Sequence, residues 1–254
     1  VRGRFHHDFW IHEGEIYTLA RVGRVIERIH PRSETLVEVI RVVSLDGAVE
    51  RDLPVLAAFL ESPYAFLLPA VPHDGAEQPT GQLDVLHANH VEVFDGSLAH
   101  RDPIYARGNI LLSARNINAI FILDGTTWEV VWIWGPTNLA FQHQPTLLDN
   151  GNILVFDNGV ERSRVLEIEP RSRELAWSYA PPSGFFSEYR GGIQRLPNGN
   201  TLITESDSGY VREVDRDGQV VWEFANPAVS SEQEREVIWR MTRIEPRTLD
   251  FLQE

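Results

Sequence analysis

Short hydrophobic runs separated by turn signals follow one another along most of the chain. The clearest example is the stretch 141–158, in which two apolar runs flank an Asp-Asn-Gly signal at 149–151. Such a signal supplies the positive φ angles that a tight turn between antiparallel strands requires. The pattern predicts a β-hairpin with strands at 146–148 and 153–156, and His143 stands just before its first strand.

The hairpin belongs to an internal repeat. A tryptophan ends the last strand of each unit, with a spacing of 45 residues, at Trp132, Trp177 and Trp222. Upstream of each tryptophan a Gly-Asn pair precedes a hydrophobic run, at 108–109, 151–152 and 199–200. Each unit contains four short strands in about 40 to 50 residues, which is typical of a β-propeller blade.

The repeat predicts an all-β chain that forms a single β-propeller domain over 1–254, built from four-stranded antiparallel blades. The blades are expected at about 5–52, 85–135, 141–180 and 190–225. An insertion at 53–84 separates the first two blades. It combines a short helix at 53–60, with Pro54 in its first turn, and a Pro-rich loop at 69–80. A further C-terminal strand is expected at 236–244.

Four blades and a loose strand do not comfortably close a ring. Propellers commonly close by pairing strands from the two ends of the chain. We therefore expect a six-bladed propeller in the complete protein, with about four blades in this chain and the N-terminal part missing. A compact four-bladed ring is the alternative.

The composition narrows the classes of function. The formal net charge of −14 over 254 residues argues against a nucleic-acid partner, because phosphate binding needs a basic face. No apolar run approaches the roughly 20 residues of a membrane helix, so no membrane span is expected. The absence of cysteine excludes thiol catalysis, zinc–thiolate sites and disulfides.

Histidines recur at the entrances of the blades. When the units are aligned on the hairpin glycine, His143 in the third blade corresponds to His87 in the second and to His7 or His6 in the first, whereas the fourth has Gly191. The first strand of a blade is the innermost, so equivalent positions converge on the central channel. Three imidazoles are therefore expected to meet at the channel mouth.

Arg115 ends the second strand of the second blade and is expected to reach the same space. Histidines and an arginine without a ring of carboxylates suit an oxyanion, with a neutral imidazole available as nucleophile. Three histidines can instead hold zinc, copper or iron, although the arginine counts against a dication. Asn89 is expected either to orient a ligand or to cap its turn, and His90 faces either the channel or the neighbouring blade.

Five motifs occur in combination. They are His7-Asp8, His87-Ala88-Asn89, Ser113-Ala114-Arg115, Gln142-His143 and Val155-Phe156-Asp157-Asn158-Gly159, with further support from 194–202. Together they resemble the bacterial aryl sulfotransferases that work without a nucleotide sulfate donor. The resemblance covers about 5–224.

The resemblance implies a periplasmic or otherwise extracytoplasmic six-bladed propeller enzyme. Such an enzyme moves a sulfuryl group from a phenolic sulfate donor to a phenolic acceptor, by a ping-pong route through a sulfohistidine. His143 would be the nucleophile, while His87, His7 and Arg115 would hold the sulfuryl oxygens. No metal or organic cofactor would be required.

The chain also departs from the family pattern. His90 stands where the family has a small polar residue, and the segment between Arg115 and His143 is short. Two other functions remain open: a His-ligated metal-binding propeller enzyme, and a non-catalytic propeller subunit or scaffold. Association with the missing N-terminal portion, with another chain or with further copies of this one is also left open.

Overall fold

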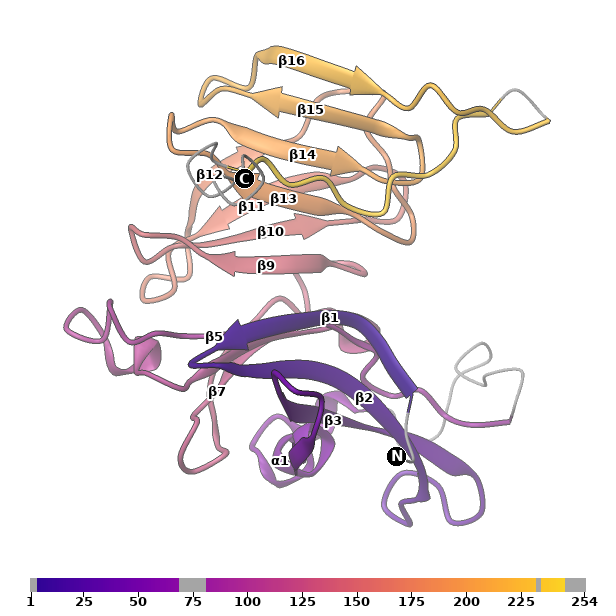
Figure 1. Ribbon diagram of the computed structural model, residues 1–254, viewed down its shortest axis with the longest axis vertical. Helices are drawn as coiled ribbons and strands as arrows, with labels where there is room; N and C mark the ends of the chain where they lie inside the picture. Colours follow the sequence, from indigo (N-terminus) through magenta and orange to yellow (C-terminus); the bar gives the residue numbers. More distant parts are fainter. Residues whose placement is uncertain (1–3, 69–80, 232–233, 245–254) are drawn as a thin grey trace. The chain divides into compact units, whose positions relative to one another are not determined.

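The computed structural model describes residues 4–68, 81–231 and 234–244 (Figure 1). These residues form sixteen strands in four sheets, and in every sheet four strands lie side by side in chain order. The predicted all-β fold of four-stranded antiparallel blades is confirmed. The Pro-rich loop expected at 69–80 lies outside the described residues. No helix in the described part of the chain has the length and apolarity needed to cross a membrane.

The four sheets follow the predicted blades closely. The first consists of β1 (Arg4–His12), β2 (Glu15–Val25), β3 (Glu34–Ser44) and β4 (Val49–Leu53). The second consists of β5 (Ala88–Val93), β6 (Ile110–Ala114), β7 (Ala119–Leu123) and β8 (Val130–Trp134). The third consists of β9 (His143–Leu147), β10 (Ile153–Asp157), β11 (Arg164–Ile168) and β12 (Leu175–Tyr179). The fourth consists of β13 (Gly192–Arg195), β14 (Thr201–Glu205), β15 (Tyr210–Val214) and β16 (Val220–Ala225).

The chain divides into two compact units, which cover 1–145 and 146–254. The first unit contains the first two sheets, and the boundary falls within β9, just after Pro145. The predicted site residues from the first three blades therefore all belong to the first unit. The single propeller domain over 1–254 and its six-bladed closure in a complete protein stay predictions.

The hairpin between β9 and β10 forms as its turn signal predicts. Gly151 has φ +85° and its N–H donates to Leu148 O at 2.8 Å, while Leu148 N–H donates to Asn152 O at 2.8 Å. The first strand begins earlier than expected, because His143 is its first residue and does not precede it. The histidine is thus held by the sheet itself.

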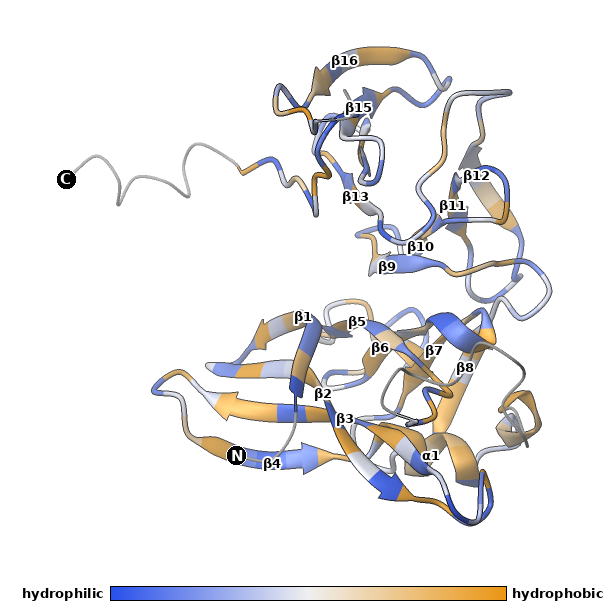
Figure 2. Cartoon of the chain, turned by 90° about the vertical axis from the view of Figure 1, so that its right-hand side faces the viewer, coloured by the Kyte–Doolittle hydropathy of each residue, from blue (hydrophilic) through white to orange (hydrophobic). Residues whose placement is uncertain are grey.

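In the first unit, the innermost strands β1 and β5 of the two sheets run side by side (Figure 1). The predicted helix of the insertion is confirmed as α1 (Val55–Glu61), which begins directly after Pro54 and packs on β3 (Figure 2). Its Phe59 is fully buried, and its ring centroid lies 5.3 Å from that of Phe121 on β7. Short 3-10 turns complete the unit at Ala65–Leu67, Pro103–Tyr105 and Arg115–Ile117.

In the second unit, a buried carboxylate joins the two sheets. Glu167 of β11 accepts hydrogen bonds from Asn152 in its own sheet and from Arg195 and Arg216 of the following sheet, at 2.8, 2.8 and 2.6 Å. Both guanidinium groups lie over the ring of Trp177, at 5.0 and 5.3 Å from its centroid. The repeated tryptophan Trp177 therefore packs against side chains of the following sheet.

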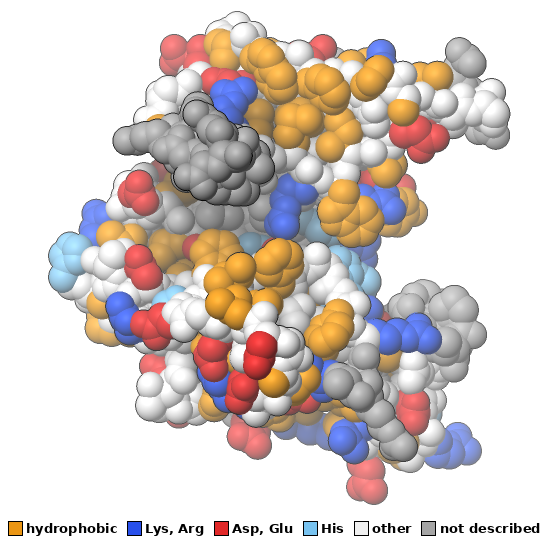
Figure 3. Space-filling view, in the orientation of Figure 1, with side chains coloured by type: hydrophobic (Ala, Val, Ile, Leu, Met, Phe, Trp, Pro, Cys, Tyr) orange, Lys and Arg blue, Asp and Glu red, His pale blue; other side chains and the backbone are white. Residues whose placement is uncertain are grey.

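The strand expected at 236–244 is not formed. This segment forms no regular ladder of backbone hydrogen bonds with a neighbouring strand. Two of its N–H groups bond to side chains instead: Met241 N–H donates to the Thr204 hydroxyl, and Arg243 N–H donates to the Gln194 side chain. It nevertheless covers the fourth sheet with Ile238 and Met241, and hydrophobic side chains gather over β14–β16 in Figure 3. Arg243 pairs with Glu213 of β15 and stacks over Trp222, much as Arg195 does with Glu167 and Trp177.

Candidate functional site

Two predicted histidines meet at the entrances of the first two blades. His7 lies in β1 and His87 directly precedes β5, and their ring centroids are 5.0 Å apart with planes inclined at 72°. Both have left-handed backbones, with φ +57° and +51°. Non-glycine residues rarely adopt this region, and such strain concentrates at functional sites. Two of the imidazoles that the alignment of blade entrances selects, one from each of two neighbouring blades, thus lie side by side.

A bulge in β1 carries His7 to this position. Phe5 pairs with Ala20 and Phe9 with Thr18, so the three residues from His6 to Asp8 stand opposite one residue of β2. Extra residues in a bulge turn side chains out of the regular alternation. As a result, His6 and His7 can both face the site, and their Nδ1 atoms lie 2.8 Å apart.

The Asp84 carboxylate orients His87 through contacts with its ring and its backbone. Its Oδ2 lies 2.6 Å from His87 Nδ1, and its Oδ1 accepts the His87 backbone N–H at 3.0 Å. Burial alone would raise the pKa of Asp84, but the hydrogen bond and the charges of His87 and Arg21 outweigh it and lower the pKa. The ionised carboxylate therefore fixes the proton of His87 on Nδ1 and leaves Nε2 for chemistry.

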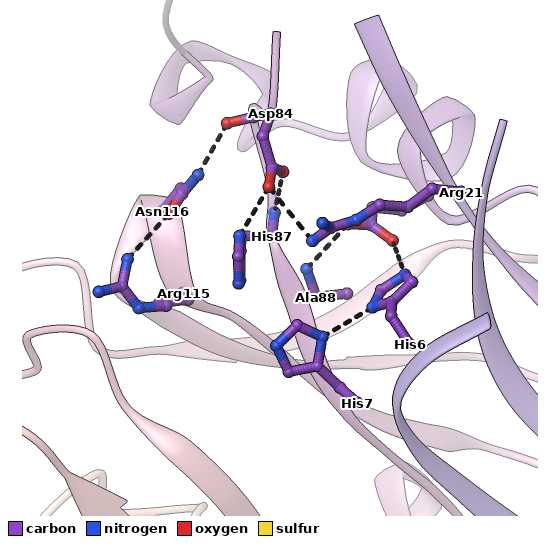
Figure 4. A network of polar contacts seen from close by, with 9 residues as sticks. His6, His7, Arg21, Asp84, His87, Ala88, Arg115 and Asn116 are labelled. Atoms are coloured by element: carbon purple, nitrogen blue, oxygen red, sulfur yellow. Dashed lines mark hydrogen bonds and ion pairs between the residues drawn. The ribbon is translucent and has the colours of Figure 1, made fainter. Parts of the chain in front are cut away.

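Arg21 extends this network into the first sheet (Figure 4). Glu38 of β3 takes part through its contacts with Arg21 and His6. Arg21 Nε donates to Glu38 Oε1 at 2.8 Å, and its Nη2 lies 3.2 Å from Asp84 Oδ2. Glu38 also lies 3.1 Å from His6 Nε2 and accepts the Ala88 N–H at 3.1 Å. One guanidinium thus separates two buried carboxylates, and each carboxylate holds one histidine.

His7 is neutral at pH 7. Burial is the largest cause and acts together with repulsion from His87, His6, Arg21 and His143 to lower the pKa of His7 from 6.5 to about 3. Part of the His7 side chain is exposed, so water limits the effect of burial, but every neighbouring charge acts in the same direction. A neutral imidazole offers one N–H and one lone pair.

His143 is the first residue of β9, and its charge acts, as the smallest of the causes, to lower the pKa of His7. It is 8% exposed. The buried Gln142 anchors it: Gln142 Nε2 donates to the Ser113 hydroxyl and to the carbonyl oxygens of Ala114 and Ala119 at 3.0 to 3.2 Å. The Gln-His motif therefore combines an anchor with a site residue.

Asn89 acts on the same peptide. Its Nδ2 donates to Gln142 O at 2.8 Å, so the amide holds the backbone just before His143. Phe141 and Gln144, on either side of the Gln-His pair, have positive φ values of +60° and +45°. The position of His143 is thus fixed by side-chain hydrogen bonds against a strained backbone. Whether Asn89 also contacts a substrate stays a prediction.

Arg115 lies beside His87, because its backbone N–H donates to His87 O at 3.1 Å. Its guanidinium stacks 4.5 Å from the centroid of Phe141, and its Nη1 donates to Asn116 Oδ1 at 3.4 Å. Asn116 in turn donates to Asp84 O at 2.7 Å. The arginine, half-buried next to the histidines, brings a positive charge to the cluster (Figure 4).

The carboxylates of the site were not predicted from the sequence. Histidines and an arginine without a ring of carboxylates were expected, whereas Asp84 and Glu38 contact His87 and His6 directly. Two signals were present in the sequence: an acidic residue three positions before His87, and a glutamate in the middle of the apolar strand 34–44. Arg21 lies close to both carboxylates and compensates their charge.

The fourth blade has glycine at the aligned position for a steric reason. A Cβ on Gly191 would lie 2.3 Å from the ring of Phe156. No histidine fits there without displacing this buried aromatic ring. The same unit contains a cavity of about 470 Å³ lined by Arg162, Phe186 and Tyr210, among others, and by none of the predicted site residues.

Within 4–68, 81–231 and 234–244, no three His, Asp or Glu side chains are arranged to hold a metal ion. Asp84 and Glu38 each contact Arg21, a backbone N–H and one histidine, and the rings of His7 and His87 interact edge to face. The described residues therefore provide no ligand set for a His-ligated metal site.

The comparisons with known proteins identify the family. The arylsulfotransferase (ASST) family matches residues 40–227, most of the chain, so the chain belongs to this family. The matched range contains His87, Arg115 and His143 but not His7. A comparison with curated proteins found no match.

Two solved structures are among those to which the chain is similar. A protein of unknown function from Bacteroides caccae is 16% identical with a TM-score of 0.48, over 77% of this chain and 59% of that one. Virginiamycin B lyase from Staphylococcus aureus is 14% identical with a TM-score of 0.47, over 86% of this chain and 55% of that one. This chain thus spans little more than half the length of either protein.

The neutral state of His7 can be tested by following its ring resonances by NMR. Because burial and neighbouring charges disfavour the imidazolium, His7 is expected to show no protonation step between pH 8 and pH 5. Replacement His6→Ala removes one source of repulsion and should move the protonation of His7 to higher pH. Titration of His7 above pH 6 in the unmodified protein would contradict this assignment.

Proposed function

We propose that the protein transfers a sulfuryl group from an aryl sulfate to a phenolic acceptor through a sulfohistidine on His143. The observation that carries the proposal is the cluster of His7, His87 and His143 with Arg115, in a chain of the arylsulfotransferase family. The choice of His143 as nucleophile rests on its Gln-His motif. Its anchored backbone supports this choice, because a nucleophile must be held in line with the reacting atom.

In the first half-reaction, a ring nitrogen of His143 attacks the sulfur of the donor. The nitrogen–sulfur bond forms as the bond between sulfur and the aryl oxygen breaks, and the phenolate leaves. His87 gives the proton on its Nε2 to the departing oxygen and becomes neutral. Asp84 supports the protonated form of His87 before this step through its 2.6 Å contact with Nδ1.

The second half-reaction reverses these roles. The acceptor phenol gives its proton to His87 Nε2 while its oxygen attacks the sulfur. The nitrogen–sulfur bond breaks, the new aryl sulfate leaves, and His143 and His87 return to their starting states. One histidine therefore serves as general acid first and as general base second, as a ping-pong route requires.

The sulfuryl oxygens need positive charge and N–H donors as the group is transferred. Arg115 supplies the charge, since Arg21 is already shared by Glu38 and Asp84. His7 supplies a donor when His6 carries two protons. His6 then donates through Nε2 to Glu38 and through Nδ1 to His7 Nδ1, which leaves an N–H on His7 Nε2.

The resemblance supports two further parts of the proposal. The location of the protein is extracytoplasmic, and its propeller has six blades in the complete form. Neither bears on the chemistry of the cluster, which lies within the first unit.

The covalent intermediate gives a direct test. Mixing the protein with 4-nitrophenyl sulfate without an acceptor should release a burst of about one nitrophenol per site and add the mass of one SO₃ to the peptide that contains His143. His143→Ala should abolish both signals, whereas the exposed His100→Ala should change neither. Turnover without any adduct on His143 would refute the assigned nucleophile.

The role of the Asp84–His87 pair is tested with Asp84→Asn. Loss of the carboxylate removes the support for protonated His87, so kcat with unsubstituted phenyl sulfate should fall by about 100-fold. With 4-nitrophenyl sulfate, whose phenolate leaves without a proton, kcat should fall by less than about tenfold. Equal losses with both donors would show that Asp84 only maintains structure.

A further inference from the structure

A second histidine–carboxylate cluster lies just behind the site. His90 of β5 is 2% exposed, and its Nδ1 lies 2.8 Å from Oδ2 of Asp8, the residue that follows His7 in the β1 bulge. On its other side, His90 Nε2 lies 3.8 Å from Glu92 Oε2. The three residues therefore connect the innermost strands of the first and second blades.

The charge of this cluster can be assigned. Burial alone would lower the pKa of His90, but the interactions with Asp8 and Glu92 outweigh it and raise the pKa above the ordinary value. Nε2 of His90 has no hydrogen-bond partner among the described residues, and Glu92 is its nearest negative charge. These interactions therefore favour the protonated, imidazolium form of the buried ring.

Charged groups on the surrounding strands do not compete for His90. β6, which pairs with β5, contains only Ile, Leu, Ser and Ala, and its Ser113 stands opposite His90. On β2, Arg21 is engaged by Glu38 and Asp84, Glu15 pairs with Arg51, and Arg24 is exposed. The charged groups that face the ring are Asp8 on β1 and Glu92 on β5.

The cluster also lies where the two strands are irregular. In β1, the bulge covers His6 to Asp8, and in β5 the register shifts between Ala88 and His90. Asp8 fixes the bulge, because its Oδ1 accepts the Phe9 N–H at 3.0 Å and its carbonyl accepts from Thr18. The contact between His90 and Asp8 thus joins the irregular part of β1 to that of β5. In the sequence, Asp8 is one residue from His7 and His90 is three residues from His87.

We propose that His90 is a positioning residue, which holds the β1 bulge against β5 so that His7 and His87 meet in the geometry that sulfuryl transfer needs. The effect of His90 on catalysis rests on the proposed function, whereas its contact with Asp8 does not. His90 touches no reacting atom in this scheme. It acts through Asp8, and its loss changes the spacing of two imidazoles.

The contact between His90 and Asp8 depends on the protonation of His90, and the sign of its pH dependence follows from the raised pKa. A histidine whose folded pKa is raised stabilises the fold below its ordinary pKa, and this stabilisation is lost as pH rises through the folded value. At alkaline pH the neutral ring no longer pairs with both carboxylates. Transfer activity is therefore expected to fall on the alkaline side as His90 loses its proton.

The unmodified protein provides the first test, by NMR. The ring protons of His7 and His87, whose centroids are 5.0 Å apart, should show a nuclear Overhauser effect. This effect should weaken as pH rises, in step with deprotonation of His90 followed through its ring nitrogen shifts. An effect that persists after His90 has lost its proton would overturn the proposal.

Variants provide the second test. His90→Gln should remove the Overhauser effect, lower kcat with 4-nitrophenyl sulfate by about 10- to 100-fold with little change in KM, and remove the alkaline decrease. Adding Asp8→Asn should restore part of kcat through a neutral hydrogen-bonded pair. The exposed His100→Gln should match the unmodified protein in every measurement.

The outcomes separate the two proposals. If the unmodified protein transfers no sulfuryl group, the proposed function fails, yet the Overhauser effect still tests the link. If His90→Gln keeps both the effect and kcat, the positioning role fails while the sulfotransferase assignment stands.

Discussion

The site depends on the ion pairs of Arg21 with Glu38 and Asp84. Two buried carboxylates next to each other would repel and take up protons, because an uncompensated charge is costly to bury. Arg21, whose side chain is only 14% exposed, contacts both at 2.8 and 3.2 Å, and its charge acts together with the hydrogen bond and charge of His87 to lower the pKa of Asp84. Asp84 can then orient His87, and Glu38 can bind His6. The guanidinium of Arg21 thus allows a polar cluster to be buried between two hydrophobic sheets.

The backbone imposes a second constraint. His7 and His87 have positive φ, and so do Phe141 and Gln144 on either side of the Gln-His motif. Such conformations persist only when surrounding contacts hold them. Gln142 and Asn89 supply those contacts near His143, and Asp8 does so near His7. The charged contacts and the strained backbone conformations therefore occur in the same place, where the first strands of the blades begin.

Much of the fold could be predicted from the sequence, because turn glycines and alternating hydrophobic residues act locally. The hairpin at 141–158 and the helix after Pro54 formed as expected. The segment 236–244 carries the same alternation but forms no ladder, since its hydrogen bonds go mainly to side chains of the fourth sheet. Alternation indicates which face of a segment is buried, but it does not indicate whether a neighbouring strand will pair with it.

The site was predictable only in part, for a related reason. Repeat alignment identified His7, His87 and His143 because equivalent positions of blades converge. It could not identify Arg21, Glu38 or Asp84, which lie on other strands or in the insertion and meet the histidines only through packing. His90 was left open between channel and neighbouring blade, and it faces Asp8 of the neighbouring blade.

We propose that an imidazole of this cluster carries the sulfuryl group during transfer. A crystal structure of the protein after brief exposure to an aryl sulfate, without acceptor, would show where the group is bound. Sulfur should be bonded to a ring nitrogen of His143, with sulfuryl oxygens facing Arg115 and His7. Sulfur bonded elsewhere, or an intact donor bound only in the cavity near Arg162, would contradict it.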